Sequence, residues 1–185
     1  NTLSVDHPDI MDFIGCKLAE EKKIQALVAA GYDGDYNGDA VDTVAYQNTN
    51  LSVRLTDKFM KDEAEDNKHQ TQFVGKWHDE GATAPAFRAK DVFRKIAECA
   101  HACGDPGVQF SDTINKWHTY GPTNPINSSN PCSEYLYIDN SACNLASINL
   151  IKFADKDHQF NWDKFDRTIG LLITAMDVLV SRSSY

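Results

Sequence analysis

The sequence contains the run Asn127-Ser-Ser-Asn-Pro-Cys-Ser-Glu-Tyr135, followed closely by Asn140-Ser-Ala-Cys-Asn144. Within the first run, Asn130, Cys132 and Glu134 occupy alternate positions. In an extended backbone, alternate residues project to the same side. The pattern therefore predicts one thiol flanked by a carboxamide and a carboxylate on a single face.

Pro131 separates two members of this set. Proline has a fixed φ and no backbone donor, so we expect it to resist helix and to stiffen the segment. A single cysteine beside a glutamate is more often a small packing residue next to a surface charge. On the short pattern alone, that structural interpretation stays open.

The longer strings are more specific. They read Ser129-Asn-Pro-Cys-Ser-Glu134 and Ser141-Ala-Cys-Asn-Leu-Ala-Ser-Ile-Asn-Leu150. Together they resemble the active-site region of ribonucleotide reductase large subunits, above all the adenosylcobalamin-dependent (class II) branch. The resemblance covers essentially all of residues 1–185 but only a middle part of the family's chain, which implies an internal fragment of the catalytic barrel domain with both ends truncated.

The resemblance implies a role for each matching residue. Cys132 would carry a thiyl radical, Glu134 would act as general base, and Asn130 would hold the substrate by hydrogen bonds. Ser129 would also contribute to substrate binding. Cys143 would belong to a redox-active pair whose partner lies upstream of Asn1.

A polar segment, residues 31–50, leads into the run Tyr46-Gln-Asn-Thr-Asn-Leu-Ser-Val-Arg-Leu-Thr-Asp-Lys-Phe-Met60. This run resembles the reductase segment that contains the loop linking effector and substrate bases. Gln47, Asn48 and Asn50 have side chains suited to hydrogen bonding with base edges. An ordinary polar turn is the alternative for each of them.

The resemblance also implies cofactors and partners. It implies adenosylcobalamin, bound mainly by parts outside or facing this fragment, with dNTP or ATP as allosteric effectors. The substrate would be a ribonucleoside di- or triphosphate, and the reductant a thioredoxin- or glutaredoxin-type protein. A homodimer is compatible with this interpretation.

Two alternatives remain beside the class II interpretation. The first is an iron-dependent (class I) large subunit, although the short interval between Cys132 and Cys143 and the wording Ser-Ala-Cys-Asn-Leu favour class II. The second is a non-catalytic nucleotide-binding or regulatory domain of the same fold. The joint presence of Asn130, Cys132, Glu134 and Cys143 argues against it, because a binding module needs no radical site.

Composition excludes several classes. The chain has 185 residues, 42% of them hydrophobic and 24% charged, which is ordinary for a globular domain. A net charge of -9 argues against a protein built mainly to hold nucleic acid. We see no bilayer-spanning run and no signal-peptide pattern. Five cysteines in no secreted-type framework indicate a reducing, cytoplasmic environment.

No metal site is expected. Asp33, Asp35, Asn37 and Asp39 alternate as in a calcium loop, but Val44 stands where an EF-hand has its closing glutamate. Cys99 and Cys103 share a helical face without further zinc ligands. We interpret both cysteines as packing residues.

Periodicity predicts alternating strands and helices, and hence the α/β class. By resemblance this is part of a ten-stranded α/β barrel with a central active-site finger loop. Helices are predicted over residues 6–18, continuing to Gly31, over residues 90–103, and from a cap at Asn161 onward. Strands are predicted at the N-terminus, over residues 51–55, 72–77 and 145–150, and from Gly107.

Overall fold

The computed structural model describes residues 1–73, 83–121, 123–130 and 132–184. The chain divides into two compact units, Asn1–Asp139 and Asn140–Tyr185, and each is considered by itself. Pro131 and most of the strand predicted over residues 72–77 lie outside the described residues.

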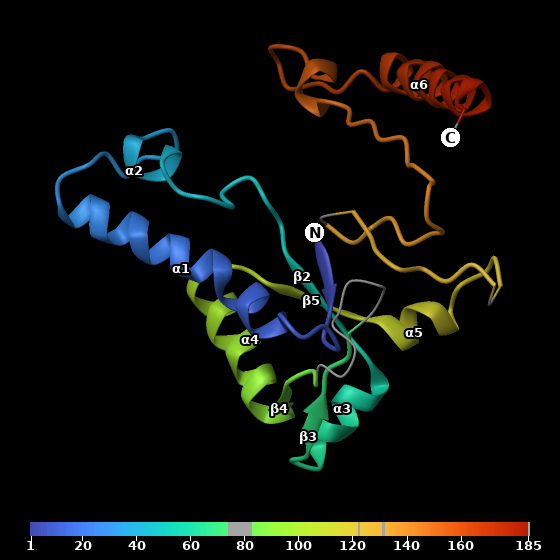
Figure 1. Cartoon of the computed structure of the whole chain (residues 1–185). Coiled ribbons are helices and arrows are strands. Elements are labelled where there is room, and N and C mark those ends of the chain that lie inside the picture. Colours follow the sequence, from blue (N-terminus) through green and yellow to red (C-terminus); the bar gives the residue numbers. More distant parts are fainter. Residues whose placement is uncertain (74–82, 122, 131, 185) are drawn as a thin grey trace. The chain divides into compact units, whose positions relative to one another are not determined.

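The first unit is organised around a parallel sheet (Figure 1). Its strands are β1 (Thr2–Ser4), β2 (Ser52–Leu55) and β5 (Gly107–Phe110), in the order β1-β2-β5. Parallel neighbours require long crossover connections, which usually contain helices. Helices α1 (Ile10–Ala29) and α4 (Ala89–Cys103) lie in these connections and pack against each other. The α/β class is confirmed.

Helix α1 begins at Ile10, four residues later than predicted, with Asp9 at the N-cap. The reason is a turn after β1, in which the His7 amide donates to the Ser4 carbonyl at 3.0 Å. Asp6, at the start of the predicted helix, instead uses its carboxylate to bond His69. The C-terminal end agrees with the prediction, because Gly31 takes the left-handed conformation that glycine tolerates.

The predicted helix over residues 90–103 is confirmed as α4, which ends at Gly104. Helix α3 (Asp57–Ala64) was not predicted; the Thr56 side chain caps it by accepting from the Phe59 amide at 3.1 Å. The hairpin of β3 (Lys68–Gln70) and β4 (Ala86–Arg88) was also missed. Two short helices, α2 (Asp39–Asp42) and α5 (Ser111–Lys116), complete this unit.

The main hydrophobic core of the first unit lies between the parallel sheet and helices α1, α3 and α4. Its buried members are Val5, Ile10, Ile14, Val53, Leu55, Phe59, Ala89, Val92, Ile96 and Cys99. The strand predicted over residues 51–55 is confirmed, with its apolar side chains turned into this core. The intervening Arg54 is also buried, on the other face of the strand.

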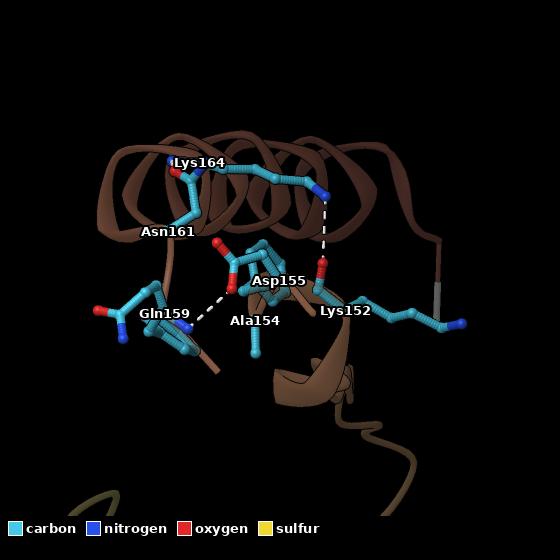
Figure 2. Close-up of a pocket in the computed structure, with 8 residues that line it drawn as sticks. Lys152, Ala154, Asp155, Gln159, Asn161 and Lys164 are labelled. Atoms are coloured by element: carbon cyan, nitrogen blue, oxygen red, sulfur yellow. Dashed lines mark hydrogen bonds between the residues drawn. The ribbon is translucent and has the colours of Figure 1, made fainter. Parts of the chain in front are cut away.

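The second unit contains the 3₁₀ helix η1 (Leu150–Phe153) and helix α6 (Trp162–Arg182). Asn161 caps α6 as predicted, accepting from the Lys164 amide at 2.9 Å. Figure 2 shows the hollow beside this cap, where the Lys164 ammonium bonds the Lys152 carbonyl at 3.2 Å. The strand predicted over residues 145–150 is wrong, because no described backbone forms a ladder with it.

None of the helices within the described residues is both long and apolar enough to cross a membrane.

Candidate active site

Cys132 lies in a tight turn rather than in an extended strand. The Ser133 amide donates to the Asn130 carbonyl at 3.1 Å, and Ser133 has φ of +63°. A residue other than glycine rarely adopts this left-handed conformation. The prediction that Asn130, Cys132 and Glu134 share one face of an extended backbone is therefore wrong, since the segment turns between them.

The turn nevertheless brings Asn130 and Glu134 together. A hydrogen bond from the Asn130 side chain, and then one from the backbone amide of Glu134, hold the pKa of the Glu134 carboxyl below its usual value. The Asn130 side-chain oxygen accepts from the Tyr135 amide at 2.9 Å. One carboxamide thus closes the turn and stabilises the carboxylate beside the thiol.

The five cysteines are free and fall into two groups. Cys132 in the first unit and Cys143 in the second are exposed. Burial raises the pKa of the Cys16 and Cys99 thiols, which disfavours reactive thiolates there. Cys103 donates to the Cys99 carbonyl within α4 at 3.4 Å. The prediction that Cys99 packs inside the fold is confirmed by its burial.

Two residues that the sequence analysis missed lie beneath the turn. Gln109 of β5 donates to the hydroxyl oxygens of Ser129 and Ser133, at 2.6 and 2.9 Å. Arg54 of β2 donates to the Gln109 side-chain oxygen at 3.1 Å. Both side chains are buried. In the sequence, the only sign of these residues was a polar side chain within each of two predicted strands.

The chain entering the turn is also anchored. Arg54 donates to the Ile126 carbonyl at 2.8 Å, and Asn115 of α5 donates to the same oxygen at 3.1 Å. The Ile126 amide donates back to the Asn115 side chain at 2.8 Å. Because Ile126 is buried, this anchor determines where the turn begins.

The loop residues predicted to contact bases precede β2. Gln47 and Asn48 line a polar hollow of about 390 Å³ together with residues of the α2 region. The Gln47 Nε2 atom is buried and has no hydrogen-bond partner among the described residues. Lys17, ion-paired with Asp105, donates to the Thr49 carbonyl at 2.9 Å and ties the loop to α1.

A cluster of histidine, cysteine or carboxylate groups able to hold a metal ion is absent from the described part of the chain. The Asp33 carboxylate instead caps its own turn, accepting from the Asp35 amide at 3.0 Å.

Comparison with known proteins matches the whole of residues 1–185 to the family described as the ribonucleotide reductase barrel domain. The chain belongs to this family. It is similar to the vitamin B12-dependent ribonucleotide reductase of Rhodopirellula baltica, with 49% identity over all 185 residues. It is also 48% identical, over 96% of its length, to the enzyme of that name from Streptomyces avermitilis.

A more distant relative is the vitamin B12-dependent ribonucleoside-diphosphate reductase of Mycobacterium tuberculosis, 28% identical over 99% of this chain. The matched region spans 18% of the first two relatives and 22% of the mycobacterial one. The resemblance seen in the sequence to ribonucleotide reductases is thus confirmed at the level of the family.

Proposed function

We propose that this chain forms the radical-bearing part of a class II ribonucleotide reductase, which converts ribonucleotides to 2′-deoxyribonucleotides. The observation that carries the proposal is the exposed Cys132 thiol on a closed turn, in which the Asn130 carboxamide lies close enough to the Glu134 carboxyl to lower its pKa. The names of the relatives, which specify vitamin B12-dependent reductases, support the same conclusion.

The complete domain in this proposal is a ten-stranded α/β barrel, of which residues 1–185 are an internal piece. Three parallel strands joined through helices are compatible with part of a barrel wall. The Cys132 turn would be the tip of the central finger loop. Its attachment to Arg54 and Gln109, on the face of the sheet opposite the helical core, supports that arrangement.

In the proposed reaction, the Cys132 thiyl radical takes the hydrogen atom from C3′ of the ribose and becomes a thiol. Glu134 accepts the proton of the 3′-hydroxyl. Its lowered pKa further favours the ionised form, which an acceptor must have. Asn130 holds the substrate hydroxyl groups beside the carboxylate while the 2′-hydroxyl leaves as water.

Replacing the 2′-hydroxyl by hydrogen requires two electrons. We assign them to Cys143 and a partner cysteine outside this chain, which together change from two thiols to a disulfide. A thioredoxin- or glutaredoxin-type protein would reduce that disulfide between turnovers. The exposure of the free Cys143 thiol is compatible with such exchange.

Adenosylcobalamin, when bound, supplies the oxidising radical that removes the hydrogen atom from the Cys132 thiol. The accessible free thiol of Cys132 fits this role. We assign the binding of the corrin mainly to regions outside or facing this chain.

The remaining assignments concern nucleotides. We propose that Ser129 contacts substrate through its main chain, because its hydroxyl hydrogen is donated to the Asn130 carbonyl at 2.8 Å. We propose that Gln47, Asn48 and Asn50 respond to dNTP or ATP effectors. The buried Gln47 Nε2 atom, which has no hydrogen-bond partner in the described part of the chain, supports a binding role, since buried polar groups are normally satisfied.

The test is reduction of CDP and CTP by the full-length protein with dithiothreitol, with and without adenosylcobalamin. Wild type, Cys132→Ser and Cys143→Ser should be compared. We expect product only with adenosylcobalamin, and none from Cys132→Ser.

Other outcomes separate the alternatives. A requirement for an iron-containing partner would assign the chain to class I. Nucleotide binding without reduction under either condition would favour a regulatory domain. Activity retained by Cys132→Ser would refute the assigned radical position.

A further inference from the structure

We propose that Arg54 and Gln109 are positioning residues. They orient the turn that carries Cys132 through a chain of hydrogen bonds in which the donor and acceptor of each bond are determined. The inference rests on the proposed function, because it concerns the placement of the radical-bearing thiol. It adds two residues of the sheet to the proposed site residues around Cys132, which lie in the loop.

Strand pairing places the two residues side by side. In the parallel ladder of β2 and β5, Arg54 is the direct partner of Gln109. Arg54 is 7% exposed and Gln109 is 4% exposed, so neither polar group has ready access to water. Buried groups of this kind are costly unless their hydrogen bonds are satisfied, which constrains the geometry of everything they contact.

The direction of the chain follows from elementary chemistry. A guanidinium has donors only, so the Gln109 oxygen must face Arg54. The Gln109 amide nitrogen then faces the turn and donates to both serine hydroxyls, Ser129 and Ser133. Because its oxygen accepts from Gln109, the Ser129 hydroxyl uses its own hydrogen for the Asn130 carbonyl, at 2.8 Å.

The two serines bracket the radical position. Ser129 precedes the turn and Ser133 follows Cys132 directly, so one amide group holds both ends. Ser133 is also the residue with φ of +63°. Such a conformation costs free energy on its own and persists where surrounding contacts enforce it. We infer that the Gln109 contact enforces it here and thereby determines the direction of the neighbouring thiol.

Gln109→Glu is the sharpest test variant. It preserves side-chain volume and an acceptor for Arg54, but a carboxylate cannot donate. The serine hydroxyls must then turn toward position 109, which removes the Ser129 hydrogen from the Asn130 carbonyl. Ser111→Ala is the matched control, because Ser111 donates at 2.9 Å to the Leu55 carbonyl at the end of the same ladder and does not touch the turn.

Both variants should be made in the full-length protein, with kcat, KM and the thermal midpoint measured for each. We expect Gln109→Glu to lower kcat about 10- to 100-fold with KM changed less than about threefold, as for a misplaced reacting group. Ser111→Ala should stay within about twofold of wild type in kcat. The thermal midpoint of Gln109→Glu should remain within a few degrees of wild type.

A second measurement does not depend on turnover. In the protein without cofactor, the rate of Cys132 alkylation by iodoacetamide should rise at least about threefold in Gln109→Glu, because a turn without the Ser129 bond to the Asn130 carbonyl opens more often. The rate in Ser111→Ala should match wild type.

A double-mutant comparison tests the route of the effect. If Gln109 acts through Ser133, adding Ser133→Ala to Gln109→Glu should lower kcat by no more than about twofold further.

The inference is overturned if kcat of Gln109→Glu lies within twofold of wild type, or if its loss of kcat follows a matching loss of thermal stability. If either result is found while the Cys132→Ser variant is inactive, only the positioning role of Arg54 and Gln109 is rejected. An active Cys132→Ser variant instead rejects the proposed function.

Discussion

The Asn130 carboxamide, whose oxygen accepts from the Tyr135 amide at 2.9 Å, lies beside the Glu134 carboxyl in the turn that carries Cys132. This contact is the largest cause of the lowered pKa of the Glu134 carboxyl. The carboxamide therefore has a chemical effect beyond holding the backbone: it favours the ionised form of the group that we propose as general base.

The first prediction concerns this pair. Asn130→Ala removes the carboxamide beside the carboxyl, so the pKa of Glu134 should rise toward its ordinary value. A base must be ionised to act, and the acidic limb of the pH profile of kcat/KM should consequently move to higher pH. The profile of the full-length protein from pH 4 to 8 measures this shift. An unmoved limb, with activity remaining, would show that Glu134 is not the titrating base.

The second prediction separates redox from packing cysteines. Cys143→Ser should lower steady-state turnover at least about 100-fold, because the two-electron donor is lost. Thermal stability should be unchanged, since Cys143 is exposed. Cys103→Ser is the matched control and should retain turnover, because Cys103 donates only to the carbonyls of Cys99 and Asp105, at the end of α4. Equal losses in the two variants would contradict the assignment.

The third prediction concerns His69, which is buried between two carboxylates. Its Nε2 lies 2.7 Å from Asp6 and its Nδ1 lies 2.8 Å from Asp62. Both carboxylates are acceptors, so the ring needs both N–H groups and is protonated. The bond to Asp6, opposed by burial and reinforced by Asp62, raises the pKa of His69, and Lys58 pairs with Asp62 alongside.

A raised folded-state pKa gives a stability contribution that is complete below the unfolded value of about 6.5 and is lost as pH rises through the folded value. His69→Gln should therefore destabilise the fold by about 3 kcal/mol at pH 6 and by less at pH 9. Urea unfolding at both values measures the difference. A loss independent of pH would indicate that the imidazolium charge is not involved.

The fourth prediction tests the core. Phe59 is fully buried and its ring meets His69 edge-on, with centroids 5.1 Å apart. Phe59→Ala should destabilise the fold by about 3–5 kcal/mol, through lost apolar burial and the cavity left behind. Leu145→Ala is the comparison variant, because Leu145 is exposed in its own unit. Chemical denaturation of both should show a large loss only for Phe59→Ala.

The sequence by itself determined three things: the residues of the turn that identify the family, the alternation of strand and helix, and several helix ends. Gly104 ends α4, and Asn161 caps α6, as predicted. These features are readable because a cap or an amphipathic period depends on residues only a few positions apart, whose own conformational preferences decide the local structure.

Tertiary structure alone decided the environment of the thiol. The alternate spacing of Asn130, Cys132 and Glu134 suggested an extended strand, whereas contacts with a distant amide support a turn. Arg54 and Gln109 become neighbours only when β2 pairs with β5, and His69 meets Asp6 only when the β3–β4 hairpin folds onto the turn after β1. Such partners are far apart in the chain, and hydrogen bonding between buried groups is specified by packing rather than by local sequence.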